Sequence, residues 1–97
     1  MYEGILRNIR ILTRAGAYRL SSHAEGEAYA DGLALDDLEH ALLHGYVVER
    51  QKDLDSGEWK YLVEGPTLTR GRVVVVAKIA PRGTLFLVTV YRLTGGN

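Results

Sequence analysis

The sequence predicts a single α+β domain in which N-terminal helices pack on an antiparallel sheet of about four strands built by the C-terminal half. Two observations predict this: apolar residues recur at intervals of three and four up to Gly45, and at intervals of two beyond it. The length of the chain is a third observation, because 97 residues bury roughly 60 to 65% of their unfolded surface around one core. We therefore treat residues 1–97 as one domain.

The first expected helix covers residues 3–15 and ends at Gly16. Its apolar positions share one face at helical spacing: Ile5, Ile9 and Leu12. Three arginines share another face at similar spacing: Arg7, Arg10 and Arg14. This second face indicates either a solvated surface or a basic ridge for phosphates or an acidic partner protein.

Two further helices are expected before the sheet. Ser22 and Glu25 have the spacing of a capping box, which predicts that the second helix starts there and covers about 23–31. The third is expected over 35–44, with acidic residues in its first turn and a left-handed stop at Gly45.

The strands are expected at 46–51, 59–64, 73–80 and 84–93. The last two contain nearly continuous apolar runs, which predicts central strands that are covered on both faces. On the last strand, alternation places Thr89 and Tyr91 on one face and Phe86, Val88 and Val90 on the other. The tail at 95–97 is expected to fray.

Composition restricts the function. Twelve basic residues balance twelve acidic ones, which counts against a nucleic-acid binder, since such proteins usually carry a basic excess. The absence of cysteine excludes disulfides, thiol nucleophiles and thiolate metal sites, and fits a reducing compartment such as the cytoplasm. The apolar runs are much shorter than the roughly 20 residues of a membrane helix, so no membrane partner is expected.

His23 is the first candidate for chemistry. It opens the second helix, where the helix dipole favours the neutral imidazole of a general base. The alternative is a structural histidine that bonds a loop carbonyl. Glu27 follows one turn later and could orient His23, act as a second acid or base, or form only a surface contact.

His40 and His44 also lie one turn apart, at the spacing of two zinc ligands, but no motif supplies a third ligand. We therefore predict neither a metal nor a cofactor. Trp59 and Tyr61 share a strand face with Val63, which is more typical of core packing than of base stacking.

Hydroxyl and basic side chains gather on the last two strands. Thr89 and Tyr91 are neighbours on one face, and Arg72 and Lys78 share a face with the valines between them. These cations either mark the points where the strand leaves the core or provide positive charge beside a site.

Several short motifs together resemble a family of small bacterial domains of unknown function. They are SSHA at 21–24, ALLHGYVVE at 41–49, YLVEG at 61–65, GRVVVV at 71–76 and TVY at 89–91. That family is similar in layout to RelE and BrnT-like toxins, compact proteins of toxin–antitoxin pairs that cleave messenger RNA. The resemblance implies a family-like core of about 20–93, preceded by an N-terminal helix. It also implies a RelE-like fold, a cleft lined by His23, Arg72, Thr89 and Tyr91, and a neighbouring antitoxin that covers it.

By this resemblance the domain is toxin-related and could be a metal-independent RNA endonuclease. His23 would be the base, Arg72 or Lys78 the cation and Tyr91 the acid. One departure is Glu27, because relatives usually carry arginine four residues after the histidine. The alternatives are a non-catalytic interaction module that pairs through a strand edge or the first helix, as a homodimer or with a partner, and a small-molecule binding protein.

Overall fold

Three helices and a five-stranded mixed sheet make up the fold in the computed structural model, which describes residues 1–93. The helices are α1 (Glu3–Arg14), α2 (Ser22–Ala30) and α3 (Leu35–His44), and the strands are β1 (Tyr18–Leu20), β2 (Tyr46–Lys52), β3 (Trp59–Pro66), β4 (Arg72–Ile79) and β5 (Leu85–Leu93). The expected fraying at 95–97 lies outside the described residues.

The sheet order is β1-β5-β4-β3-β2. Four neighbouring strands are antiparallel, as expected, but β1 pairs in parallel with β5, which makes the sheet mixed and adds a fifth strand. The expectation of about four antiparallel strands was therefore incomplete. The sequence did not predict β1, because three residues are too few to show an alternation with a period of two.

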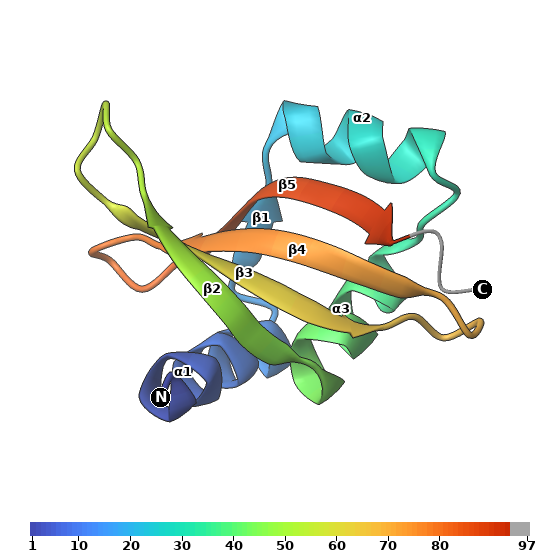
Figure 1. The fold of residues 1–97 in the computed structure, drawn as a ribbon, viewed down its shortest axis with the longest axis horizontal. Helices are drawn as coiled ribbons and strands as arrows, with labels where there is room; N and C mark the ends of the chain where they lie inside the picture. Colours follow the sequence, from blue (N-terminus) through green and yellow to red (C-terminus); the bar gives the residue numbers. More distant parts are fainter. Residues whose placement is uncertain (94–97) are drawn as a thin grey trace.

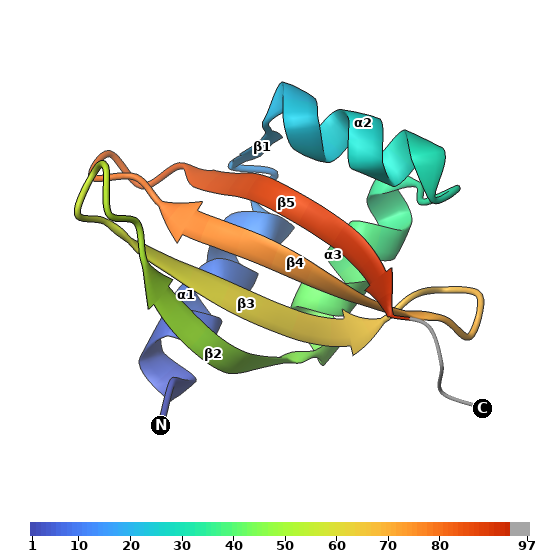
Figure 2. The same cartoon turned by 45° about the horizontal axis from the view of Figure 1, so that its top comes forward.

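Helices cover one face of the sheet, and the other face is open. Figure 2 shows α1 and α3 behind the sheet, and in both Figures 1 and 2 α2 runs along the outer side of β5. The core lies between α1, α3 and the sheet, and its fully buried side chains include Ile9, Leu38, Leu42, Val63, Val75 and Leu87.

The open face is apolar at its centre, although no described helix covers it. Leu62, Val74 and Val76 are each at most 8% exposed there and pack with Val88. The expectation that the last two strands are central and covered on both faces is confirmed for β4, because residues 73–77 are all buried, although side chains rather than a helix shield its open side. For β5 it holds only in part, because β1 pairs with just its first three residues.

Two glycines allow α3 to approach β3 closely. A Cβ on Gly65 would lie 2.3 Å from the carbonyl oxygen of Ala41, and a Cβ on Gly45 would lie 2.2 Å from the carbonyl oxygen of Glu64. Gly45 is not the expected left-handed stop, because its φ of −94° is ordinary. Close backbone packing is the reason for glycine at both positions.

The capping box expected at Ser22 is also displaced. The N-cap of α2 is Ser21, whose Oγ accepts the amide hydrogen of Ala24 at 3.0 Å. Asp37 has the comparable role at α3, since one carboxylate oxygen accepts from the amide of Ala34 and the other from the amide of Leu68. The β3–β4 loop is thereby joined to the start of α3.

Candidate functional site at the β5 edge

Arg72, Thr89 and Tyr91 share the open face of the sheet. The β4–β5 register places Thr89 opposite Val76 and Tyr91 opposite Val74, two positions along the strand from Arg72. Tyr91 is 38% exposed. The expectation that the two hydroxyl residues share one face is confirmed, and so is the common face of Arg72 and Lys78 with the valines between them.

A β-bulge corrects the rest of the expected alternation. Ala77 pairs with Leu87 and Val76 with Thr89, so Val88 is an extra residue on β5. Because a bulge inverts the alternation beyond it, Val88 packs on the open face and Val90 in the core. The prediction that Val88 and Val90 share a face was therefore wrong. Without the bulge, the hydroxyls of Thr89 and Tyr91 would face the core.

Groups of α2 and of the residues that cap it form hydrogen bonds with the outer edge of β5 where β1 no longer reaches. Ser21 Oγ donates to the carbonyl oxygen of Val88 at 3.0 Å, and Glu27 Oε1 accepts from the amide of Val90 at 2.9 Å. At the end of the strand, Arg92 donates a guanidinium hydrogen bond to the carbonyl oxygen of Asp31 at 3.0 Å. The helix thus covers a strand edge that would otherwise expose unpaired backbone groups.

His23 joins this edge through Glu27. Its Nε2 lies 3.3 Å from Glu27 Oε2, while the other oxygen of the same carboxylate is bound to Val90. The imidazole is exposed, with 70% of its side-chain surface accessible, whereas Glu27 is 27% exposed. A neutral imidazole that donates from Nε2 to Glu27 keeps its Nδ1 lone pair for a proton.

The structure thus brings His23 and the two hydroxyl residues to the same segment of β5. Val90, whose amide binds Glu27, lies between Thr89 and Tyr91 in the chain. The side chains leave this segment in different directions, since His23 lies beside the strand edge and the hydroxyls project from the open face. Arg72 lies on that same face, one strand away.

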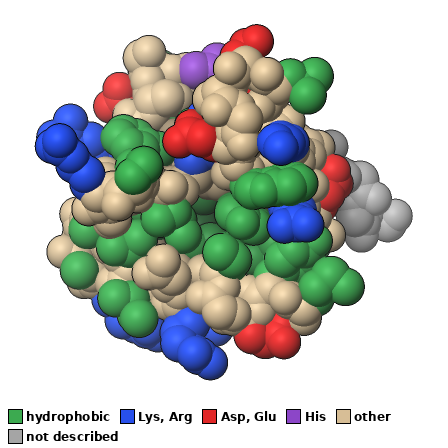
Figure 3. Space-filling view, turned by 90° about the vertical axis from the view of Figure 1, so that its left-hand side faces the viewer, with side chains coloured by type: hydrophobic (Ala, Val, Ile, Leu, Met, Phe, Trp, Pro, Cys, Tyr) green, Lys and Arg blue, Asp and Glu red, His purple; other side chains and the backbone are tan. Residues whose placement is uncertain are grey.

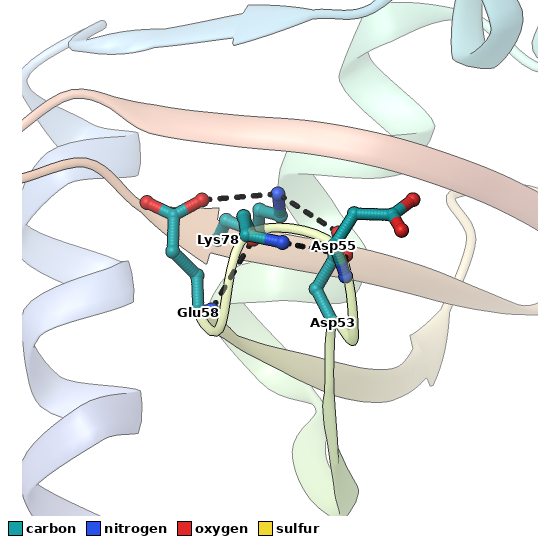
Figure 4. Close-up of polar contacts among 5 residues, drawn as sticks. Asp53, Asp55, Glu58 and Lys78 are labelled. Atoms are coloured by element: carbon teal, nitrogen blue, oxygen red, sulfur yellow. Dashed lines mark hydrogen bonds and ion pairs between the residues drawn. The ribbon is translucent and has the colours of Figure 1, made fainter.

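The cations of the open face already have partners. Arg72 Nε donates to Glu64 Oε2 at 3.0 Å. Lys78 Nζ lies 3.2 Å from Glu58 and 3.3 Å from Asp53, both in the β2–β3 turn (Figure 4). Between the two cations considered for phosphate binding, Arg72 is the more accessible, because its side chain is 44% exposed and that of Lys78 is 20% exposed.

The Lys78 cluster orders the β2–β3 turn. Asp53 Oδ1 accepts from the amides of Asp55 and Ser56, and these hydrogen bonds lower the pKa of Asp53, with Lys78 adding to the shift. The hydrogen bond to Glu58 is the main reason that the pKa of Lys78 is raised. Lys78 is therefore a structural cation at this turn.

Three titratable residues lie elsewhere, of which the sequence indicated two histidines and missed one tyrosine. The imidazoles of His40 and His44 lie side by side with ring centroids 4.3 Å apart, and no group of three metal-ligating side chains is found among residues 1–93. Tyr18 was missed: its hydroxyl donates to Glu39, and burial followed by this contact raises its pKa to about 12. Since β1 itself was not predicted, no pattern in the sequence indicated this pair.

Glu27 is the residue whose importance the sequence only partly indicated. Its position one turn after His23 gave the contact with the imidazole. The bond to Val90 could not be anticipated from local spacing, because the two residues are 63 positions apart. A usable signal was the small-residue face of α2, where Ala24 and Ala28 are buried and allow the helix to lie close to β5.

These features define a small α+β domain with one open sheet face. A His–Glu pair lies at the outer edge of β5, the strand next to β1 in the sheet. Residues 20–92 match the family described as Domain of unknown function (DUF4258), and the chain belongs to that family. The helix α1 precedes the matched region. Comparison with curated proteins gave no match, and neither did comparison with solved structures. No helix within residues 1–93 is long and apolar enough to cross a membrane.

Proposed function

We propose that this chain is a toxin-related domain of the RelE and BrnT type that cleaves RNA without a metal, at the edge and open face of β5. One observation carries the proposal: Glu27 binds both the His23 imidazole and the amide of Val90, between Thr89 and Tyr91. A histidine held by a carboxylate at the strand edge, with two hydroxyls and an arginine on the adjoining open face, offers the groups required for acid–base cleavage of a phosphodiester.

The proposed reaction begins at the imidazole. Glu27 Oε2, 3.3 Å from His23 Nε2, orients the ring, and Nδ1 takes the proton of a ribose 2′-hydroxyl. The 2′-oxygen then attacks phosphorus, the bond to the 5′-oxygen breaks, and the hydroxyl of Tyr91 gives its proton to that leaving oxygen. The products are a 2′,3′-cyclic phosphate and a free 5′-hydroxyl.

Arg72 supplies the positive charge in this proposal. Its guanidinium is held by Glu64 on the open face, and it must turn from that carboxylate toward the phosphate when RNA binds. Thr89, on the same face, offers a hydroxyl that could donate to a phosphate oxygen. The resemblance to RelE and BrnT-like toxins implies a neighbouring antitoxin that would cover this surface, and an antitoxin is the partner we propose here.

Expression in bacteria tests the proposal. Wild-type protein is expected to arrest growth and degrade RNA, and both His23→Ala and Tyr91→Phe are expected to relieve this. His44→Ala and Tyr29→Phe are the matched controls, because His44 is exposed on α3 and Tyr29 is 88% exposed on α2. Harmless expression of soluble wild-type protein, with RNA left intact, would refute the proposed activity.

A second candidate function is a non-catalytic interaction module that binds through α1. The observation that favours it is a charged and apolar surface on this helix. Ile11 is 55% exposed, and it lines a shallow hollow with Glu3, Leu6, Arg7, Arg10 and Arg14. Self-association measured by light scattering, lost in an Arg7→Gln and Arg14→Gln double variant, would support this alternative. A strict monomer would argue against the homodimer form.

The strand edge is the less suitable surface for such pairing. β2 is the exposed edge strand, but it carries Glu49, Arg50 and Lys52 and a bulge near Val48. Charged residues and bulges are the features by which natural sheets prevent edge-to-edge pairing.

A further inference from the structure

Trp59 lies outside the core, on the rim of a hollow at one end of the sheet. The side chain is 38% exposed, and the hollow lies between α1 and the ends of β3 and β4. Figure 3 shows this end of the molecule, where apolar side chains surround a depression. Its lining residues are Ile5, Asn8, Glu58, Trp59, Tyr61, Ile79 and Pro81.

Two cations lie over the tryptophan ring. The guanidinium carbon of Arg50 is 4.0 Å from the ring centroid, and Lys52 Nζ is 5.6 Å from it. Within the described chain, neither cation has a carboxylate partner, in contrast to Arg72 and Lys78. Contact with the ring thus holds two uncompensated charges beside an aromatic surface.

The polar groups of the hollow are few and fixed. They are the Asn8 amide and the Glu58 carboxylate, together with the Tyr61 hydroxyl and the Trp59 indole N–H. Glu58 Oε1 accepts a hydrogen bond from Lys78 Nζ, which holds the carboxylate in place. Among the described residues, Oε2 forms neither a hydrogen bond nor an ion pair. An amide and a carboxylate oxygen in a largely apolar hollow can bond the edge of a planar polar ligand.

We propose that this hollow binds one unpaired nucleotide of RNA, an inference that rests on the proposed function because it assigns where the substrate is held. The base lies in the hollow against the exposed part of Trp59, and its phosphate lies beside Arg50 and Lys52. An aromatic ring with adjacent cations is the arrangement by which proteins bind single-stranded nucleic acid. The binding needs an unpaired base, since a paired base cannot offer its face.

This surface is separate from the proposed catalytic groups. Trp59 shares the helix-covered side of the sheet with Tyr61 and Val63, whereas Thr89 and Tyr91 project from the open side. Variants at the hollow therefore leave the β5 groups in place, and the two proposals can fail independently.

The experiment uses intrinsic fluorescence, because Trp59 is the single tryptophan of the chain. The probes are tetranucleotides of 2′-O-methyl RNA, which cannot be cleaved through the 2′-hydroxyl. We expect saturable quenching that weakens as salt is raised, since phosphate contacts depend on ionic strength. An abasic tetranucleotide with the same backbone is expected to give little quenching.

Variants identify the residues responsible, with binding measured by the anisotropy of a labelled tetranucleotide. Trp59→Ala should weaken binding about tenfold or more, and Trp59→Phe, which keeps a ring, should weaken it less. Arg50→Gln combined with Lys52→Gln should also weaken it about tenfold. Arg19→Gln is the matched control, an exposed arginine on the strand at the opposite edge of the sheet. Circular dichroism establishes that each variant is folded.

Equal binding of the abasic and complete tetranucleotides, or binding unchanged in Trp59→Ala, would overturn the inference. Preferential binding of an acidic peptide at the same cations would overturn it too. If RNA cleavage occurs normally in Trp59→Ala, the inference fails and the proposed function stands. If base-dependent binding is found in a protein that cleaves nothing, the nucleotide site stands and the proposed catalysis fails.

Discussion

Gly65→Ala should be strongly destabilising, because no space exists for a methyl group between β3 and α3. The added Cβ would lie 2.3 Å from the carbonyl oxygen of Ala41, 2.7 Å from its Cα and 2.8 Å from its carbonyl carbon. Carbon atoms normally approach to about 3.5 Å, so α3 must move away by roughly 1 Å. That movement would disturb Leu38 and Leu42, which are fully buried on the same helix.

The size of the effect follows from the kind of obstacle. Overpacking of a core costs about 1 to 3 kcal/mol, and the upper end applies because backbone atoms cannot rotate away. For a domain of this size, a loss of about 3 kcal/mol lowers Tm by roughly 12 to 24 °C. Urea unfolding monitored by Trp59 fluorescence and circular dichroism measures the change in free energy.

Two further variants make the reasoning refutable. Gly26→Ala, in the interior of α2, meets no atom within 4 Å and should stabilise the protein by about 0.5 to 1 kcal/mol. Ala41→Gly should not rescue Gly65→Ala, because the obstructing atoms belong to the backbone. A Gly65→Ala protein within about 0.5 kcal/mol of wild type would show that the helix and strand are not in such close contact.

Three other predictions concern polar contacts. Glu27→Ala should cost about 1 to 2 kcal/mol and speed hydrogen exchange at the Val90 amide, whereas Glu27→Gln keeps the acceptor and should retain stability while losing RNA cleavage; equal stability of both variants would contradict the edge contact. The stability difference between wild type and Lys78→Met should be constant near neutral pH. It should shrink as the pH falls below about 4 through the lowered pKa of Asp53, and again above about pH 10.5 as Lys78 loses its proton; a difference that does not change with pH would argue against the ion pairs. Tyrosine absorbance should show one group titrating near pH 12 that is absent in Tyr18→Phe, and the stability it contributes below pH 10 should be lost as the pH rises through 12; identical titrations would refute the burial of this hydroxyl.

Periodicity in the sequence was sufficient to locate the long elements. The first helix was expected over 3–15 and is found at Glu3–Arg14, and the third was expected and found at 35–44. Each of these helices buries a continuous apolar face, and the spacing of the apolar residues in the sequence directly indicates which face is buried. The last strand was likewise located to within a residue of its start.

Features that depend on distant contacts were not predictable in this way. The bulge at Val88 arises from how β5 pairs with β4, and local alternation gives no sign of it. The choice of Ser21 over Ser22 as the cap depends on where the chain leaves β1. The same limit applies to the site. The common face of Thr89 and Tyr91 was predicted correctly, but the contact between Glu27 and Val90 was not predicted.

The pairing of β1 with β5 has a consequence for how the protein is made. Tyr18 lies opposite Leu85, so β1, the first strand to be synthesised, can pair only after β5, the last strand, has been synthesised. Bringing β1 and β5 together closes a long segment of chain, and the conformational entropy lost in this step is not offset by the local contacts formed earlier. During synthesis, α2 therefore lacks its contacts with β5 until that strand emerges, and the Glu27–Val90 hydrogen bond beside His23 can form only then.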